Sequence, residues 1–553
     1  MLLHHPIHHV FIFFMLLFSF PNYSQSLTTY EDDERTILLI LKQHWGYPFS
    51  VFEQWNSTSS PCDWPGISCN FNGSVTRISL SGMNIPGSFP ASTIICQLNN
   101  LVSINLSSNN LWGTIPANLS SCSKLEELDL SGNYIFTGKL PGELFSMKKL
   151  RTLDLSMNSF SGSIPDDIGN LYNLGYLDLS MNYLSGPIPS TLLHLQQLSH
   201  LSLSSNKLTG KIPSQLFSLK KLRSLMLSQN KFYGEIPAPK VPHSLESLVI
   251  SNSHLNGSIP EDIRNLYNLG YLDLSGNSFT GSIPDDIGSL YNLGHLDLSR
   301  NSFTGSIPDD IRSLYNLGHL DLSRNFFTGS IPDDIGSLYN LGHLDLSKNS
   351  FSGPIPARLL QLHKLYYLSL ASNNLSGEIP VKLDLFSLTH IYLSDNHLSG
   401  SIPRGFRELQ QLENIDLSHN KFSGDICESV SQMWAIPALD TLRICKNHFS
   451  GRIPYELMKL KHIVFRCFDE ANLCSYARDK RFPTCPSQLF SDYSVPQHCA
   501  SNKSKKIIEV VIAAVLIIVG LGILILVLRY AWGRRRENDG EEWSMEGQEK
   551  YIE

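Results

Sequence analysis

The sequence predicts an α/β-type repeat solenoid with disulfide-stabilised caps, followed by one transmembrane helix. Three observations predict it: a motif repeated at nearly constant spacing, cysteines confined to the two ends of the repeats, and a long apolar run near the C-terminus. The chain has 553 residues, of which 42% are hydrophobic and 17% are charged. This composition is typical of a folded chain rather than a disordered one.

The first element in the chain is a short apolar run. Residues 10–20 are almost entirely apolar, and small and polar residues follow at 24–26. This order is typical of a secretory signal peptide, which we place at 1–26. The flank before the run carries histidines where Lys or Arg is usual, so a buried apolar segment is the alternative. Eleven residues are too few to cross a bilayer as a helix.

Residues 27–77 are predicted to form the N-terminal cap of the solenoid. They contain a helical stretch at 30–44 with acidic residues near its start, and further on the sequence CDWPGISC. Cys62 and Cys69 bound that sequence, and we expect them to form a short disulfide bond. Structural disulfides imply an oxidising compartment, in agreement with a signal peptide.

The repeated motif is L-x-L-x-x-N-x-L/F-x-G-x-I-P, and it occupies residues 78–465 in about sixteen units. Most units begin 24 residues after the previous one, and the other steps are 23, 25, 26 and 27 residues. Such a period is the signature of leucine-rich repeats, in which each unit forms one coil of a solenoid. Because one coil cannot close a core alone, the array depends on neighbouring coils and on caps.

Each position of the motif has a physical role. In one unit Leu296 and Leu298 are expected to point inward and Asp297 outward, because side chains alternate along a strand. The asparagine follows in fourteen of sixteen units, and the exceptions carry Met83 and Ser253. Its amide is expected to bond backbone groups of the neighbouring coil, so that stacked copies form a ladder.

The end of the chain predicts a membrane anchor. Residues 466–502 are expected to form a C-terminal cysteine cap and juxtamembrane segment, and 507–528 form an apolar run of 22 residues. At ~1.5 Å per residue, such a helix spans the ~30 Å hydrocarbon core. Basic residues lie on both sides, so the signal peptide and the cysteine caps set the direction, with the N-terminus outside. The tail, 529–553, is too short for a folded domain.

Several classes of function are not expected. The net charge of −7 gives no support for a nucleic-acid partner. Neither a phosphate-binding P-loop nor the kinase motifs occur, so we expect no enzyme and no cofactor. Columns of His and Asp could suggest a metal site or acid–base chemistry, but repeats place like residues in rows rather than in a converging pocket. We therefore expect neither.

The cap sequence CDWPGISC and the L-x-G-x-I-P segment resemble those of plant extracellular leucine-rich-repeat receptors, over about residues 30–528. Cys96 and Cys122 resemble cysteines in the early repeats of HAESA-like receptor kinases, and we expect them to bridge adjacent coils. The ending FDEANLCSYARDKRFPTC resembles the segment that closes such ectodomains. That resemblance implies a disulfide between Cys474 and Cys485. Four cysteines keep no assigned pairing: Cys427, Cys445, Cys467 and Cys499.

The sequence departs from that family in two respects. A kinase domain is not found after the apolar run, so the chain resembles a kinase-less receptor-like protein. Receptors of the HAESA kind hold a ligand carboxylate with an Arg-x-Arg pair on a late repeat, and no such pair occurs in the ectodomain. Arg404 and Arg407 are spaced differently and lie beyond the strand of their unit. This departure disfavours recognition of a peptide hormone by that route.

The concave sheet of a solenoid is a natural recognition surface. We expect three exposed columns of side chains to contact a peptide or protein ligand. They are Tyr271, His295, His319, His343 and Tyr367; Asp273, Asp297, Asp321 and Asp345; and Arg300, Arg324 and Lys348. The alternative to ligand contact is that Asp belongs to the ordinary composition of the repeat scaffold, and that the units are nearly identical because they arose by duplication.

Sequons for N-glycosylation also occur along the ectodomain. They are at Asn56, Asn72, Asn105, Asn118, Asn256, Asn374 and Asn502. Asn105 is expected on a concave strand, where a glycan would bar ligands from that end of the sheet.

The sequence thus predicts a single-pass type I receptor-like protein of the plasma membrane. It would bind a peptide or protein ligand on its concave face and signal through a partner receptor kinase, in development or defence. Two alternatives stay open. One is a membrane-anchored inhibitor or decoy that binds a secreted hydrolase, since the repeats also resemble polygalacturonase-inhibiting proteins. The other is a truncated receptor kinase.

Overall fold

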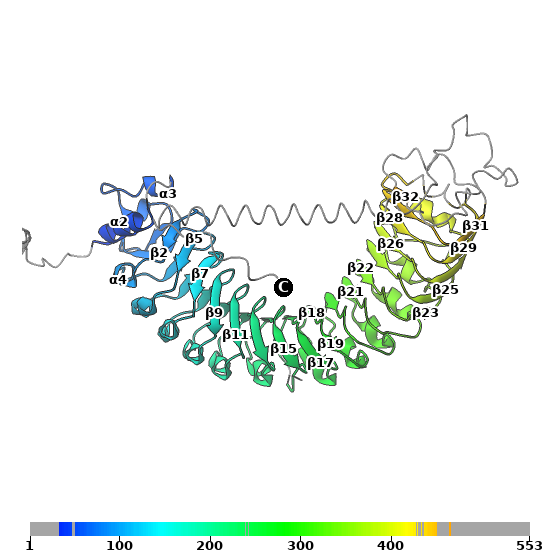
Figure 1. Ribbon diagram of the computed structural model, residues 1–553, viewed down its shortest axis with the longest axis horizontal. Coiled ribbons are helices and arrows are strands. Elements are labelled where there is room, and N and C mark those ends of the chain that lie inside the picture. The colour runs from blue at the N-terminus through cyan, green and yellow to red at the C-terminus, as the bar shows by residue number, and fades with distance from the viewer. Residues whose placement is uncertain are drawn as a thin grey trace, which may run out of the picture.

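A computed structural model describes residues 33–46 and 50–450, except 238, 242, 427, 428, 430–432, 434 and 435, and also the strand Val464–Phe465. The described residues form an open arc of stacked coils, with the N-terminal cap at one end (Figure 1). Within them, no helix combines the length and apolar character needed to cross a membrane. The predicted signal peptide, C-terminal cysteine cap, transmembrane helix and tail lie outside the described residues.

The N-terminal cap is built around a small aromatic core. Helix α2 (Glu34–His44) begins where Asp33 Oδ1 accepts a hydrogen bond from the Arg35 backbone N–H. It is followed by α3 (Ser50–Glu53), the 3-10 helix η1 (Pro61–Asp63) and strand β1 (Ile67–Cys69), which pairs antiparallel with β2 (Val75–Ser79). The predicted Cys62–Cys69 disulfide closes this segment. The aromatic core consists of Trp45, Phe52, Trp55 and Trp64.

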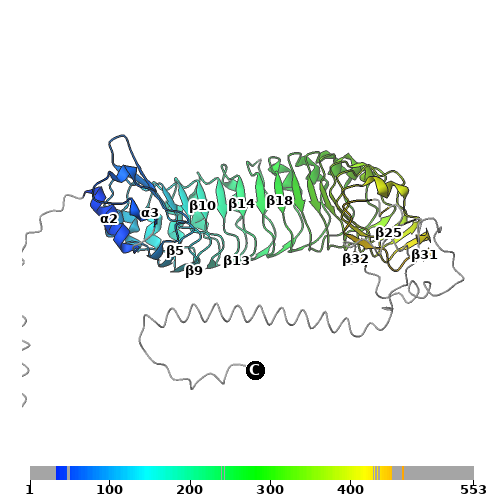
Figure 2. The ribbon, with the colours of Figure 1, turned by 90° about the horizontal axis from the view of Figure 1, so that it is seen from above.

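The concave face of the arc is a parallel sheet that runs from the cap to the last described strand (Figure 2). Neighbouring strands pair in register, so that Leu296 lies directly beside Leu320 of the next repeat. After β2 the strands are β4 (Ser103–Asn105), β6 (Glu127–Asp129), β8 (Thr152–Asp154), β10 (Tyr176–Asp178), β12 (His200–Ser202), β14 (Ser224–Met226), β16 (Ser247–Val249), β18 (Tyr271–Asp273), β20 (His295–Asp297), β21 (His319–Asp321), β22 (His343–Asp345), β24 (Tyr367–Ser369), β26 (His390–Tyr392), β28 (Asn414–Asp416), β30 (Thr441–Arg443) and β32 (Val464–Phe465).

A second row of short strands follows the first, which the sequence analysis did not predict. They form two parallel sheets of nine and five strands within the described residues. The first contains β3 (Pro86–Ser88), β5 (Asn110–Gly113), β7 (Ile135–Gly138), β9 (Ser159–Ser163), β11 (Tyr183–Gly186), β13 (Lys207–Gly210), β15 (Lys231–Gly234), β17 (His254–Gly257) and β19 (Ser278–Phe279). The second contains β23 (Ser352–Gly353), β25 (Asn374–Glu378), β27 (His397–Gly400), β29 (Lys421–Asp425) and β31 (His448–Ser450).

The outer edge of the arc carries short helices, most of them 3-10 (Figure 1). Each 3-10 helix from η2 to η10 begins directly after a proline, which belongs to an I-P step except before η3, where Leu140 precedes it. The extended backbone at this proline ends the preceding segment. The helices are α4 (Ser92–Ile95), η2 (Ala117–Ser121), η3 (Gly142–Ser146), η4 (Asp166–Asn170), η5 (Ser190–His194), η6 (Ser214–Ser218), η7 (Glu261–Leu266), η8 (Asp285–Ser289), η9 (Asp309–Ser313), η10 (Asp333–Ser337), η11 (Leu359–Gln361) and η12 (Arg404–Glu408). The predicted parallel-strand solenoid is thereby confirmed.

Apolar side chains from the strands and the outer helices fill each coil. One unit buries Leu296, Leu298, Phe303, Ile307 and Ile311, each of them at most 3% exposed. Burying such a side chain contributes roughly 2 kcal/mol. Phe303 lies against the phenylalanines of both neighbouring units, with ring centroids 6.0 and 6.1 Å apart. The core is therefore continuous from coil to coil.

The predicted asparagine ladder is present and buried. The Asn301 amide donates to Leu274 O at 3.0 Å, and to Leu298 O and Ser299 O at 3.1 Å. Its Oδ1 accepts a hydrogen bond from Phe279 N–H at 3.0 Å. The amide thus joins two coils. Where the ladder is interrupted, the buried Ser253 hydroxyl has no hydrogen-bond partner among the described residues.

We expect Asn301→Ala to lower the free energy of unfolding by about 2–4 kcal/mol, because backbone groups of two coils lose buried partners. Chemical denaturation followed by circular dichroism measures the change. Thr304→Ala is the control, because Thr304 is exposed in the same unit. Equal stability of the two variants would show that the ladder contributes little.

Candidate ligand-binding surface

The predicted aromatic column, Tyr271, His295, His319, His343 and Tyr367, forms a stack on the concave face. The five side chains come from the first residues of β18, β20, β21, β22 and β24, which pair in register. Successive ring centroids are 4.0, 4.1, 4.2 and 4.3 Å apart, and the ring planes differ by 15° at most. The rings therefore lie face to face and present their edges to solvent.

The three histidines of this column have lowered pKa values. Burial, together with repulsion from a charged His319, lowers the pKa of His295 to about 4. Burial and repulsion from His319 and His295 likewise lower the pKa of His343 to about 4. Burial also lowers the pKa of His319, against the attraction of neighbouring carboxylates. The stack is therefore an uncharged row of hydrogen-bonding edges at neutral pH.

The predicted carboxylate column, Asp273, Asp297, Asp321 and Asp345, has a structural role as well. One carboxylate oxygen of each accepts a hydrogen bond from the backbone N–H two residues later, at 2.8–2.9 Å, and so fixes the turn after the strand. This supports the alternative that Asp is scaffold composition. Burial, with repulsion from Asp297 and Asp345, raises the pKa of Asp321 to about 7. Burial raises the pKa of Asp297 as well.

The predicted cationic column, Arg300, Arg324 and Lys348, follows the carboxylate column. All three residues have positive φ, of 55–56°, because they occupy the turn before the ladder asparagine. In the described part of the chain none of them forms an ion pair. The two columns border a polar hollow of about 340 Å³. Its lining residues are Asn252, Ser275, Asp297, Ser299, Arg300, Asp321, Ser323, Arg324, Asp345, Ser347 and Lys348.

The three columns lie side by side over consecutive repeats. An extended ligand that follows the arc would lie along all three columns, with neutral ring edges on one side, cations on the other and carboxylates between them. Such a surface is chemically suited to a polar chain with charges of both signs, and its hollow is polar rather than an enclosed apolar pocket. The arrangement that the sequence predicted is present, whereas contact with a ligand stays a prediction.

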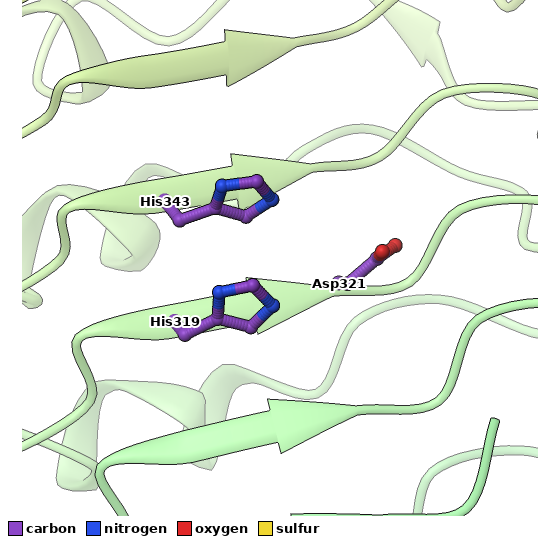
Figure 3. A group of neighbouring side chains, drawn as sticks. All are labelled: His319, Asp321 and His343. Carbon is purple, nitrogen blue, oxygen red and sulfur yellow. The ribbon is translucent and has the colours of Figure 1, made fainter. Parts of the chain in front are cut away.

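One group of side chains converges more closely than the sequence analysis expected. Potential ligand atoms of His319, Asp321 and His343 all lie within 4.8 Å of one another. Figure 3 shows the two rings side by side on adjacent strands, with Asp321 farther along the strand of His319. The sequence analysis expected the histidine and aspartate columns not to converge. It overlooked that in-register pairing of the strands brings side chains of these two neighbouring columns close together.

Four further ring side chains on the concave sheet were missed by the sequence analysis. Tyr176 and His200 stack at 4.4 Å with planes 6° apart. At the other end, His390 and Tyr392 lie 6.0 and 5.7 Å from Tyr367 in tilted orientations. Except for Tyr392, these residues occupy the same repeat position as the predicted column, so comparison of that position across all units finds them.

The remaining predicted residues are cysteines, arginines and the asparagines of sequons. Cys96 and Cys122 form the predicted disulfide between adjacent coils, and Cys445 is also disulfide-bonded. Arg404 and Arg407 lie in η12, outside the concave sheet. Asn105 lies in β4, half-buried, and accepts a hydrogen bond from Ser107 N–H. The other described sequons have exposed asparagines: Asn56, Asn72, Asn118, Asn256 and Asn374. Cys427, Cys467, Cys474, Cys485, Cys499 and Asn502 lie outside the described residues.

Family models match most of the solenoid. Residues 31–70 match the leucine rich repeat N-terminal domain, and residues 173–232 match a leucine rich repeat model. Ten further segments match single leucine rich repeats: 100–122, 124–147, 149–171, 244–266, 268–290, 292–314, 316–338, 340–362, 387–409 and 411–433. With the repeated coils and the ladder described above, the chain belongs to the leucine-rich-repeat proteins.

Its curated relatives are receptor-like kinases and receptor-like proteins of Arabidopsis thaliana. Receptor-like protein kinase 7 is 35% identical over 130 residues, which are 23% of this chain and 13% of the relative. Receptor-like protein 52 is 45% identical over 82 residues, which are 15% of this chain and 9% of the relative. The matched segments therefore span only a small part of these relatives.

Solved plant receptor ectodomains share the fold. The crystal structure of a TDR receptor has a TM-score of 0.64 and 33% identity, over 68% of this chain and 66% of that one. The ectodomain of the Arabidopsis thaliana receptor kinase GASSHO1/SCHENGEN3, in complex with CASPARIAN STRIP INTEGRITY FACTOR 2, has a TM-score of 0.52 and 25% identity. That match covers 78% of this chain and 72% of the other. No catalytic domain is found within the residues that the structure describes.

We expect Asp321→Asn to raise the melting temperature relative to wild type at pH 8 but not at pH 4. Both proteins are made in a bacterial host, because the change creates an Asn-Leu-Ser sequon that such a host leaves unglycosylated. The folded carboxyl keeps its proton up to about pH 7, whereas its usual pKa is 3.8. The folded state therefore binds more protons between these values, and the stability that Asp321 contributes is lost as pH rises through this window. The substituted asparagine side chain still has a carbonyl oxygen that can accept the hydrogen bond from the Ser323 N–H. Calorimetry at both pH values tests this, and a pH-independent difference would contradict it.

Proposed function

We propose that this chain is a cell-surface receptor-like protein that binds a peptide or protein ligand on its concave face. The observation that carries the proposal is the set of three adjacent columns, which repeats the same polar chemistry over consecutive coils. A neutral stack, a carboxylate row and a row of cations that form no ion pair with any described residue together suit an extended polar chain. The kinship with plant receptor ectodomains supports the same function.

We further propose that the chain spans the plasma membrane once through 507–528, with a glycosylated ectodomain outside. Signalling would pass through a partner receptor kinase, in development or defence. Glycans at the exposed sequons would leave the central part of the concave face clear, because Asn256 and Asn374 lie in β17 and β25 of the second row of strands.

The test is a pull-down of the membrane-anchored protein from plant cells, with and without elicitor extracts, scored for associated receptor kinases. The matched variant replaces His295, His319 and His343 by Ala. We expect wild type to capture a kinase, and the variant to lose the part that depends on the elicitor, because the stack no longer contacts ligand.

Circular dichroism of the variant controls for folding, which should be retained because the three rings are half-exposed. Unchanged elicitor-dependent capture by the folded variant would contradict ligand contact at the stack. Capture of a secreted hydrolase without any kinase would instead favour an inhibitor or decoy.

A further inference from the structure

Two histidines and one aspartate meet on adjacent strands of the concave sheet. His319 of β21 and His343 of β22 are direct partners in the parallel register. Asp321 lies two residues after His319, and alternation along a strand places both side chains on the same face. Their potential ligand atoms lie within 4.8 Å of one another, and Figure 3 shows the three side chains on the same side of the sheet.

We propose that His319, His343 and Asp321 bind a divalent transition-metal ion of the zinc type on the concave face. Imidazole nitrogen and carboxylate oxygen are the ligands that such ions take in proteins. Three protein ligands leave a coordination position for water or for a donor atom of a bound molecule. The proposal goes beyond ligand recognition by the stack, because the ion binds with no second molecule present.

The bound geometry requires a small rearrangement. Bonds of ~2.0–2.2 Å to one ion place the ligand atoms roughly 3–3.5 Å apart. The ligand atoms of the three side chains must therefore approach one another by roughly an ångström or more. The two rings are now nearly parallel, with centroids 4.2 Å apart, and must tilt so that their nitrogen lone pairs converge. Both rings are half-exposed, and no side-chain hydrogen bond within the described residues holds either one in place.

Asp321 can take part without losing its structural role. Its Oδ1 accepts the backbone N–H of Ser323 at 2.8 Å. A carboxylate carries about four lone-pair sites on two oxygens, so it can keep this bond and still bind an ion. Asp297 and Asp345 stand in the same column on both sides, and their negative charge attracts a cation to this place.

The chain contains matched controls. His200 stands in the same repeat position, stacked on Tyr176 rather than on another histidine, with Asp178 in the neighbouring column on the adjacent strand. His295 also belongs to the stack, but within the described residues only His319, Asp321 and His343 bring three potential ligand atoms within 4.8 Å of one another. Removing His200 or His295 should therefore leave the site intact.

The experiment measures zinc bound to the purified protein without the predicted signal peptide 1–26, which holds four histidines. The protein is first stripped with a chelator, and bound zinc is measured by equilibrium dialysis and elemental analysis. Cobalt(II) absorption reports the ligand geometry. We expect one zinc per chain above background, and a loss of affinity of at least about tenfold in Asp321→Ala and in His343→Phe. His343→Phe keeps an aromatic ring in the stack and removes only the ligand nitrogens. His200→Ala and His295→Ala should bind as wild type does, within about twofold.

Retention of the bound zinc by folded His343→Phe would overturn the proposal. An equal loss in His200→Ala would also overturn it, because it would show adventitious binding by surface imidazoles. The same holds if cobalt(II) gives only the spectrum of the hydrated ion. Since no ligand or kinase is present in this experiment, its failure leaves the proposed receptor function untouched.

Discussion

At the end of each inner strand the chain turns sharply, and the turn carries backbone N–H and C=O groups into the interior, away from water. Left unpaired there, each group would cost about 1–3 kcal/mol. The buried asparagine amide resolves this, because one side chain such as Asn301 donates to carbonyls of its own coil and of the coil before it. The same contacts fix the distance and register between coils, and the parallel sheet depends on that register.

The recognition surface follows from this register. Because strands pair without a shift, a residue type that recurs in the sequence becomes a continuous column on the concave face. Histidine at one position thus becomes a stack with centroids about 4 Å apart. Burial, together with neighbouring charges, then lowers the pKa of the His295 imidazole and raises the pKa of the Asp321 carboxyl. A short motif copied several times therefore yields a surface whose properties no single copy has.

Much of this arrangement could be predicted from the sequence. Strict periodicity locates the strands, and strand alternation assigns Leu296 to the core and Asp297 to the concave face. Cysteine spacing and position gave the Cys62–Cys69 and Cys96–Cys122 disulfides, and both are present. The asparagine ladder followed from the chemistry of a buried amide.

Other features depend on spacing between coils, which a sequence does not state. The second row of strands forms where residues after a ladder asparagine, such as β11 after Asn182, come close enough to the next coil to pair. The convergence of His319, Asp321 and His343 depends on side-chain directions in three dimensions, which the repeated residue types in the sequence do not specify. The hydrogen bonds from turn backbone to the carboxylates show why Asp alone is a weak sign of ligand binding.

Photo-crosslinking most directly tests whether the concave columns contact a ligand. A photoreactive phenylalanine analogue at Tyr367 reports on the end of the stack. The same analogue at Tyr339, a 74% exposed residue outside the concave sheet, is the matched control. After exposure to elicitor extracts, we predict a crosslinked product from position 367 and none from 339. Equal crosslinking at both positions, or crosslinking at 339 alone, would contradict binding on the concave face.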